Sequence, residues 1–396
     1  MTGPLKFYKK FAFTIWVIVF VAASMIHPAA FRVWFGTDLK VFIVPLIQVI
    51  TFGMGTTLSA EDFRRVLTMP WPVCIGVALQ FTIMPLVATG IAHVFGFASE
   101  VAAGVILIGS VSSGVASNVM TYLAGGNVPL SVTITSMTTL LAPVVTPFWM
   151  KTLAGRFVSV DFVAMMLSIF NMIIIPIAAG LVVNRILYGA KAWARKAGLL
   201  AAIAAGSMIA AAAAAMVKRA DWGALAALKS GVILGLILMG VSALAKWVIG
   251  IVLKGPANWM DKALPIVSMG GICFIIAIIT AQSRDELLSV GLVLIAAAVL
   301  HNGTGYLLGY WGARLARLDE GACRAVAMEV GMQNGGMASG IAIDVLKSTS
   351  AALAPAIFGP WMNVSGSLLA GWWRRRPVRK TPDGRPPEEN VDPQAL

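Results

Sequence analysis

The feature that most constrains this chain is the recurrence of apolar segments about 20 residues long, each able to cross the ~30 Å hydrocarbon core of a bilayer as a helix. Hydrophobic residues make up 59% of the 396 residues and charged residues only 12%, which is roughly half the charged share of an average soluble domain. We therefore predict an all-α polytopic membrane protein. The twelve predicted spans are 11–27, 39–57, 69–95, 101–124, 129–151, 161–187, 198–217, 227–253, 263–281, 287–313, 321–346 and 353–373.

The lysines and arginines lie mainly between these segments and after the last of them, and the net charge is +13. Twelve spans place both termini on one side of the membrane, and roughly two thirds of the Lys and Arg residues fall on that side. The bias predicts cytoplasmic termini, with residues 374–396 as a disordered basic tail. No soluble domain is present to collect the charge on one face, so nucleic acid is not an expected partner.

Cys74, Cys273 and Cys323 lie in or beside separate apolar segments without paired spacing. Neither a disulfide framework nor a transition-metal site is expected from them. The protease, phosphate-loop and hydrolase signatures are absent from the sequence. We therefore do not expect an enzyme, and no organic cofactor is predicted.

Two predicted spans, 101–124 and 321–346, are interrupted by polar residues and glycine. Residues 112–118 read Ser-Ser-Gly-Val-Ala-Ser-Asn, and residues 329–336 read Glu-Val-Gly-Met-Gln-Asn-Gly-Gly. Irregular backbone at membrane depth is tolerated only against protein or a cavity. Interrupted segments at corresponding places in two halves of a chain indicate a transporter's binding site.

Glu329 is the most informative residue, because an ionised carboxylate at mid-membrane costs about 2.5–3.5 kcal/mol on insertion scales. No Lys or Arg lies within one helical turn of it, so either a proton or a bound cation must neutralise it. Uncharged oxygen donors in the same spans favour an alkali cation, while a polar network that only packs helices is the alternative. These donors are Gln80, Ser117, Asn118, Ser131, Thr135, Gln333 and Asn334.

Four segments of the chain resemble the bile acid:sodium symporter family, particularly its bacterial members: 116–123, 300–309, 329–334 and 363–370. The resemblance implies two inverted five-helix repeats, divided into panel and core domains, in which the fourth and ninth helices are discontinuous and cross. Panel helices would then lie in 1–57, 161–187 and 263–281. Core helices would lie in 69–151 and 287–373.

Carried over onto this chain, the family's residues imply two sodium sites as coupling ions. The first site would use Ser117, Asn118, Ser131, Thr135 and Glu329. The second site would use Gln80, Glu329, Gln333 and the backbone carbonyls of Val330 and Met332. The acid group of the substrate would lie near Val115, Asn334 and Asn363.

The chain departs from the family pattern in three places. Val115 stands where some members have a hydroxyl residue, and Met362 stands where some have histidine, which leaves the substrate undefined. Residues 191–257 add two spans between helices that directly follow one another in the family. A packing or oligomer role is the expectation for this two-helix insertion.

The resemblance implies secondary active symport of sodium with an organic anion, either bile-acid-like or a small carboxylate, by alternating access in the cell inner membrane. Two sodium ions and Glu329 sum to a charge of +1, so a monocarboxylate would neutralise the occupied site. A proton-coupled or uncoupled permease of the same fold is the alternative, followed by a membrane sensor that binds an acid without moving it. The identity of the anion, the stoichiometry, the direction of transport and the oligomeric state stay open.

Overall fold

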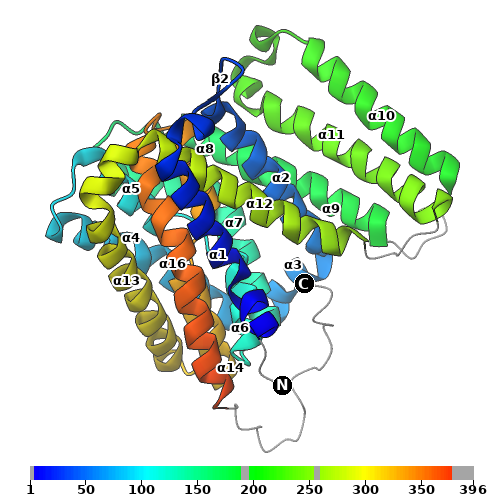
Figure 1. Cartoon of the computed structure of the whole chain (residues 1–396). Coiled ribbons are helices and arrows are strands. Elements are labelled where there is room, and N and C mark those ends of the chain that lie inside the picture. Colours follow the sequence, from blue (N-terminus) through cyan, green and yellow to red (C-terminus); the bar gives the residue numbers. More distant parts are fainter. Residues whose placement is uncertain (1–3, 189–195, 254–258, 377–396) are drawn as a thin grey trace, which may run out of the picture. The chain divides into compact units, whose positions relative to one another are not determined.

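The computed structural model describes residues 4–188, 196–253 and 259–376, and these are almost entirely helical (Figure 1). The predicted tail lies outside the described residues from position 377 onward. Contacts divide the chain into two compact units. Of the described residues, the first comprises 4–41, 61–165 and 273–376, and the second comprises 42–60, 166–188, 196–253 and 259–272.

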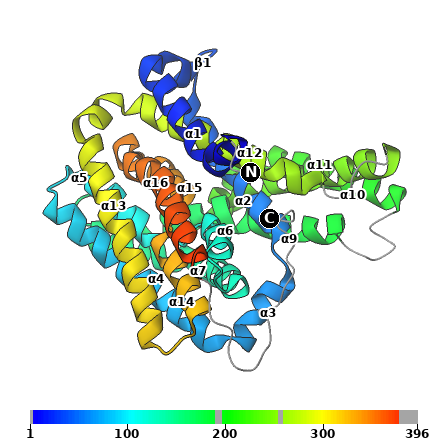
Figure 2. The ribbon, with the colours of Figure 1, turned by 60° about the horizontal axis from the view of Figure 1, so that its bottom comes forward.

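The first unit begins with α1 (Pro4–Ile26) and a two-stranded hairpin, in which β1 (Val33–Trp34) pairs antiparallel with β2 (Thr37–Asp38). Short 3-10 helices, η1 (Pro28–Phe31) and η2 (Leu39–Phe42), flank this hairpin. A group of helices follows, in which α13 packs beside α4, α14 and α16 (Figures 1 and 2). They are α3 (Ala60–Thr68), α4 (Pro70–Val94), α5 (Ser99–Ser110), α6 (Ala116–Leu123), α7 (Val128–Trp149) with the π-turn η3 (Met150–Ala154), α13 (Arg284–Leu315), α14 (Glu320–Gly331), α15 (Gly335–Asp344) and α16 (Thr349–Arg374).

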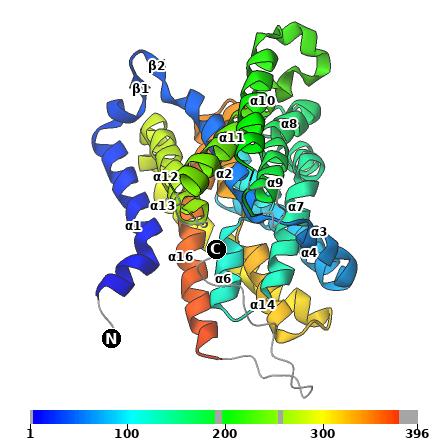
Figure 3. The same ribbon diagram turned by 90° about the vertical axis from the view of Figure 1, so that its right-hand side faces the viewer.

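The second unit contains residues 196–253, the part of the chain for which the family resemblance implies an insertion, and α10 and α11 run side by side within it (Figures 1 and 3). Two further helices, α8 (Phe162–Ile169) and α12 (Trp259–Gln282), have residues in both units. The remaining elements are α2 (Ile43–Thr57), the π-turn η4 (Phe170–Ile174), α9 (Ile175–Tyr188), α10 (Ala197–Met216), the 3-10 segment η6 (Arg219–Leu228), α11 (Lys229–Ala245) and the π-turn η7 (Lys246–Val252).

Within the described residues, eight helices are long and apolar enough to cross a membrane, which confirms the predicted multi-pass character. Eight of the twelve predicted spans overlap these helices. The other four fall on α1, on α16 and on the interrupted pairs α5–α6 and α14–α15. The eight are Leu39–Thr57, Pro70–Val94, Val128–Ala154, Phe162–Tyr188, Ala197–Met216, Leu225–Gly250, Ala263–Gln282 and Arg284–Leu315.

The insertion is fixed to its own unit by polar contacts at both ends of α11. Near its start, Asn171 of η4 donates from Nδ2 to Ser230 Oγ (2.9 Å) and accepts from Gly231 N at Oδ1 (2.7 Å). Near its end, Lys246 Nζ donates to the carbonyls of Ile186 (2.5 Å) and Leu187 (2.9 Å), which lie in the last turn of α9. The insertion therefore joins α9 through side chains that complete backbone groups.

Candidate ion-binding site

The site is built where two helix breaks meet. Residues 111–115 separate α5 from α6, and residues 332–334 separate α14 from α15. The breaks complete each other's backbone hydrogen bonds, because Gly114 N donates to Met332 O (2.8 Å) and Asn334 N donates to Ser112 O (2.9 Å). A Cβ on Gly114 would lie 2.8 Å from Gln333 O, so only glycine allows this close approach. Paired in this way, irregular backbone is acceptable in a low-dielectric interior.

Glu329 lies at the centre of the site, on the last turn of α14, and its side chain is fully buried. Four hydroxyl groups surround its carboxylate. Oε1 is 2.5 Å from both Ser117 Oγ and Ser131 Oγ. Oε2 is 2.6 Å from Ser113 Oγ and 2.7 Å from Thr135 Oγ1. No ion pair found among the described residues involves Glu329.

Oxygen acceptors outnumber the available protons in this cluster. The single proton of Ser131 Oγ is within reach of Glu329 Oε1, of Asn118 Oδ1 (2.8 Å) and of Thr121 Oγ1 (3.1 Å). Thr135 Oγ1 also lies 3.2 Å from Asn118 Oδ1. A surplus of neutral and anionic oxygens is the environment that a hard cation requires. The structure thus brings together all five residues predicted for the first sodium site.

A second polar cluster joins α4 to the break after α14. Gln80 Nε2 donates to Gln333 Oε1 and to Val111 O (3.1 Å), and Gln333 Nε2 donates to Val330 O (2.6 Å). Gln80 Oε1 is buried and has no hydrogen-bond partner among the described residues. A buried carbonyl oxygen without a donor is costly in a protein interior unless a ligand satisfies it. Four residues predicted for the second sodium site (Gln80, Gln333, Val330 and Met332) lie at or beside this break, and Glu329 belongs to the neighbouring cluster.

The residues predicted for the substrate occupy two places. Val115 and Asn334 directly precede α6 and α15, and Asn334 Oδ1 caps α15 by accepting from Met337 N (3.0 Å). Asn363 lies within α16, where its Nδ2 donates to Gly359 O (2.9 Å). The start of α15 approaches the same part of α16, because a Cβ on Gly335 would lie 3.4 Å from the Gly359 Cα atom.

Sequence reasoning missed two contributors, Ser113 and Thr138. Ser113 Oγ contacts both Glu329 and Thr138 Oγ1 (3.1 Å). Thr138 lies seven residues after Ser131, a spacing that places both on one face of α7. This periodicity was a usable signal for Thr138. Ser113 lies in a break, where no periodicity applies.

No group of three or more His, Cys, Asp or Glu side chains that could bind a metal occurs in the described part of the chain. The only carboxylate in the Glu329 cluster is that of Glu329, and its neighbours are hydroxyl and amide oxygens. This donor set suits an alkali cation rather than a transition metal.

Comparison with known proteins places these features in a family. Residues 44–221 match the model of the sodium bile acid symporter family. An uncharacterised sodium-dependent transporter of Bacillus subtilis, YocS, is 36% identical over 93% of this chain and 92% of its own length. A probable chloroplastic sodium/metabolite cotransporter of Arabidopsis thaliana, BASS1, is 25% identical over 94% of this chain and 75% of its own length. A probable chloroplastic sodium/metabolite cotransporter of rice, BASS2, is 28% identical over 92% of this chain and 70% of its own length.

Proposed function

Because this chain belongs to the sodium bile acid symporter family and is a sodium-dependent multi-pass membrane transporter rather than an enzyme, we propose that it moves an organic anion together with sodium. The observation that carries the proposal is the Glu329 carboxylate, which is fully buried among four hydroxyl groups. An ionised carboxylate in such a place needs a positive charge. A sodium ion bound by these oxygens supplies that charge.

Two sodium ions are the proposed coupling ions. The first would bind Glu329 with Ser117, Asn118, Ser131 and Thr135, at the cluster where acceptors exceed protons. The second would bind at the Gln80–Gln333 cluster, where Gln80 Oε1 lacks a donor and the carbonyls of Val330 and Met332 lie close by. Two sodium ions and one carboxylate leave a charge of +1, so binding of sodium and of a monoanion would be mutually reinforcing.

The proposed substrate is a monocarboxylate bound where α6 and α15 begin. The two helices start directly after the paired breaks, and the positive ends of their dipoles favour negative charge. Asn334 has its Nδ2 group left as a donor, since its Oδ1 is used as a cap. Asn363, two turns along α16 from Pro355, would supply a further amide.

The proposed architecture is two inverted five-helix repeats, with the pair α10 and α11 added within the second repeat, between its first helix (161–187) and its second (263–281), giving twelve spans. The core would contain α4–α7 and α13–α16 and would rock against a panel containing α1, α2, α9 and α12. Excess Lys and Arg on the side of the termini supports cytoplasmic termini in a cell inner membrane.

The test is the thermal stability of the purified full chain in sodium, potassium and choline chloride, for the wild type and Glu329→Gln. Sodium binding to the folded state stabilises it by about 2.7 kcal/mol at a hundredfold excess over Kd. We expect a sodium-specific rise in Tm that disappears in Glu329→Gln, while Ser136→Ala keeps it. Ser136 is the matched control, because its hydroxyl on α7 bonds only to Val132 O (2.8 Å) among the contacts described for it.

The proton-coupled alternative predicts a different pattern. Glu329→Gln mimics the protonated acid, so a proton carrier would show equal Tm values in all three salts and would retain exchange in proteoliposomes while losing its pH dependence. Equal stability of the wild type in the three cations would contradict sodium coupling. Sodium-dependent binding of a carboxylate without uptake into proteoliposomes would instead identify a sensor.

A further inference from the structure

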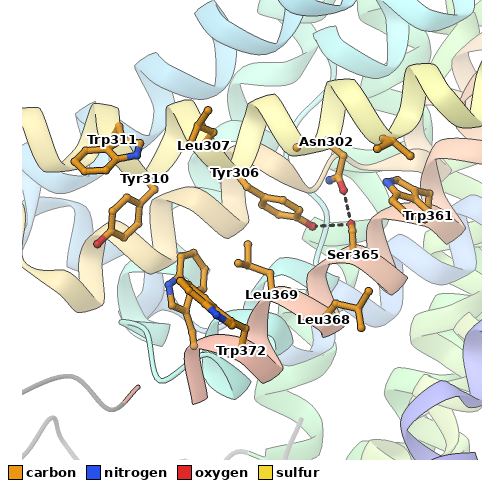
Figure 4. A pocket seen from close by; sticks show the side chains of 13 residues that line it. Asn302, Tyr306, Leu307, Tyr310, Trp311, Trp361, Ser365, Leu368, Leu369 and Trp372 are labelled. Carbon is orange, nitrogen blue, oxygen red and sulfur yellow. Dashed lines mark hydrogen bonds between the residues drawn. The ribbon is translucent and has the colours of Figure 1, made fainter. Parts of the chain in front are cut away.

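A groove separates the C-terminal halves of α13 and α16 in the first unit. The helices run parallel there, because Asn302 is paired with Ser365 and the Tyr310 ring stacks on Trp373 with centroids 5.8 Å apart. The groove has a volume of about 620 Å³, and its walls are mainly aromatic and aliphatic (Figure 4). Among the residues that line it, Asn302, Ser365 and Tyr306 form a hydrogen-bonded set.

The groove lies on the opposite face of α16 from the proposed substrate site. Trp361 and Ser365 line it, and each is two residues from Asn363, which corresponds to a rotation of about 200° around a helix. Its rim is apolar and accessible, since Leu307 and Leu368 are each 57% exposed. In a membrane helix, exposed apolar side chains of this kind face acyl chains rather than water.

The end of the groove is basic. A second hollow shares Leu368 and Trp372 with the groove and is lined by Arg374 and Arg375. Neither arginine takes part in an ion pair found among the described residues. The next residue, Arg376, places its guanidinium carbon 4.2 Å from the centroid of the Trp372 ring. One end of the apolar groove therefore lies beside two arginines.

The length of the groove matches one leaflet of a bilayer. From Trp361 to Trp372 a helix rises about 16 Å, which is about half of the ~30 Å hydrocarbon core. Tryptophan and arginine at one end are typical of the membrane interface. The other end, at Trp361, would then lie near the middle of the bilayer.

We propose that this groove binds an anionic phospholipid, with an acyl chain between α13 and α16 and the phosphate against Arg374 and Arg375. Basic pockets at the ends of membrane helices are suited to anionic headgroups. The bound chain would rest on Tyr306 and Asn302, which also hold the end of α14. Asn302 Nδ2 donates to Gly331 O, and a Cβ on Gly331 would lie 2.2 Å from the Tyr306 ring.

The test is native mass spectrometry of the delipidated full chain with an equimolar mixture of phosphatidylglycerol and phosphatidylcholine. We expect retained phosphatidylglycerol to exceed phosphatidylcholine roughly tenfold, because two arginines near the surface supply a preference of that order. Arg374→Gln with Arg375→Gln should remove the preference. Gly303→Leu should remove most of the bound lipid, because position 303 lines the groove and has open space around it.

Gly90→Leu on α4 is the matched control. Its added side chain also meets open space, and leucine is a better helix former than glycine at both positions, so neither variant should unfold the chain. Equal retention of the two lipids by the wild type, or full retention in Gly303→Leu, would overturn the proposal. So would displacement of the phospholipid by equimolar oleate, which would identify a site for a single-chain acid.

Discussion

Two charged residues of α14 lie buried five positions apart and meet opposite surroundings. Arg324 is 4% exposed, and its guanidinium donates to Glu320 Oε1 (2.9 Å), Ala124 O (2.8 Å) and Arg376 O (2.7 Å). Glu329 is fully buried, and its carboxylate meets only hydroxyl groups. The arginine has a carboxylate and carbonyl oxygens as partners, whereas the glutamate has no positively charged partner among the described residues.

The difference indicates that Arg324 has a structural role, whereas Glu329 is suited to binding a cation or a proton. Arg324 links the end of α6 and the end of α16 to α14. Its guanidinium carbon also lies 5.7 Å from the centroid of the Trp373 ring, which adds to the packing. Burying such a group is acceptable because each of its three nitrogens donates to a protein oxygen. Glu329 has hydrogen bonds but no opposite charge, and its energetic cost falls only when a cation or a proton arrives.

Arg324→Met should give the largest loss of stability. It removes the hydrogen bonds that Arg324 donates to Glu320 Oε1, Ala124 O and Arg376 O. We expect the free energy of unfolding to fall by about 3 kcal/mol, at the low end for a broken buried pair because Glu320 stays partly exposed. The measurement is Tm by differential scanning fluorimetry. The decrease should be equal in sodium and in potassium, whereas Arg64→Met, at an exposed pair with Glu61 (3.8 Å), should change Tm little. A sodium-dependent decrease would place Arg324 in the ion site.

Glu329→Gln should show the opposite dependence. In potassium the variant should equal or exceed the wild type in Tm, because an uncompensated buried charge is removed while an amide of the same size stays. In saturating sodium it should lack the stabilisation of about 2.7 kcal/mol expected at a hundredfold excess over Kd. Measuring the Tm of the wild type and the variant over a sodium titration checks the expectation in potassium and the expectation in saturating sodium. A variant less stable than the wild type in potassium would show that the wild-type carboxylate is already neutral or already paired.

Sequence alone could predict one side of this comparison better than the other. Mid-span position and the absence of nearby Lys or Arg made Glu329 conspicuous, but its partners Ser117, Ser131 and Thr135 are 194–212 residues away in sequence. Only resemblance to a family supplied that pairing, because no local spacing encodes it. The sequence analysis does not single out Arg324. Its spacing from Glu320 is local, but its other partners are backbone carbonyls of distant helix ends, which have no sequence signature.

The breaks show the same limit at the level of the fold. Glycine and polar residues predicted where α5 and α14 would stop being regular helices. They did not predict that Gly114 and Asn334 would exchange hydrogen bonds with the opposite break, because pairing of two irregular segments depends on how the helices carrying them cross. The two spans of residues 191–257 were predicted from apolar length, and only the family resemblance marked them as an insertion. Their attachment through Asn171 and Lys246 was not predicted.

Ser131→Ala should weaken sodium binding without changing the fold. It removes an oxygen 2.5 Å from Glu329 Oε1 and 2.8 Å from Asn118 Oδ1, and we expect the half-saturating sodium concentration to rise about tenfold, the effect of losing about 1.4 kcal/mol at a charged site. Sodium titrations followed by Tm give this value. Ser136→Ala on the same helix should shift it less than twofold, and an equal shift in both variants would mean that α7 itself, rather than the hydroxyl, sets the affinity.

Ser113→Ala should have the smallest effect of the series, and it sharpens what belongs to the site. Ser113 Oγ is 2.6 Å from Glu329 Oε2, but it lies in the break and was not among the predicted ion ligands. If it only orients the carboxylate, sodium affinity should fall about threefold, less than the loss of a ligand. Thr138→Val is the control, because Thr138 contacts Ser113 (3.1 Å) and Thr135 O (3.0 Å) but has no hydrogen bond to Glu329 among those described. A tenfold loss of sodium affinity in Ser113→Ala with none in Thr138→Val would make Ser113 a sodium ligand. The ion bound at Glu329 would then be coordinated by the break after α5 as well as by α6 and α7.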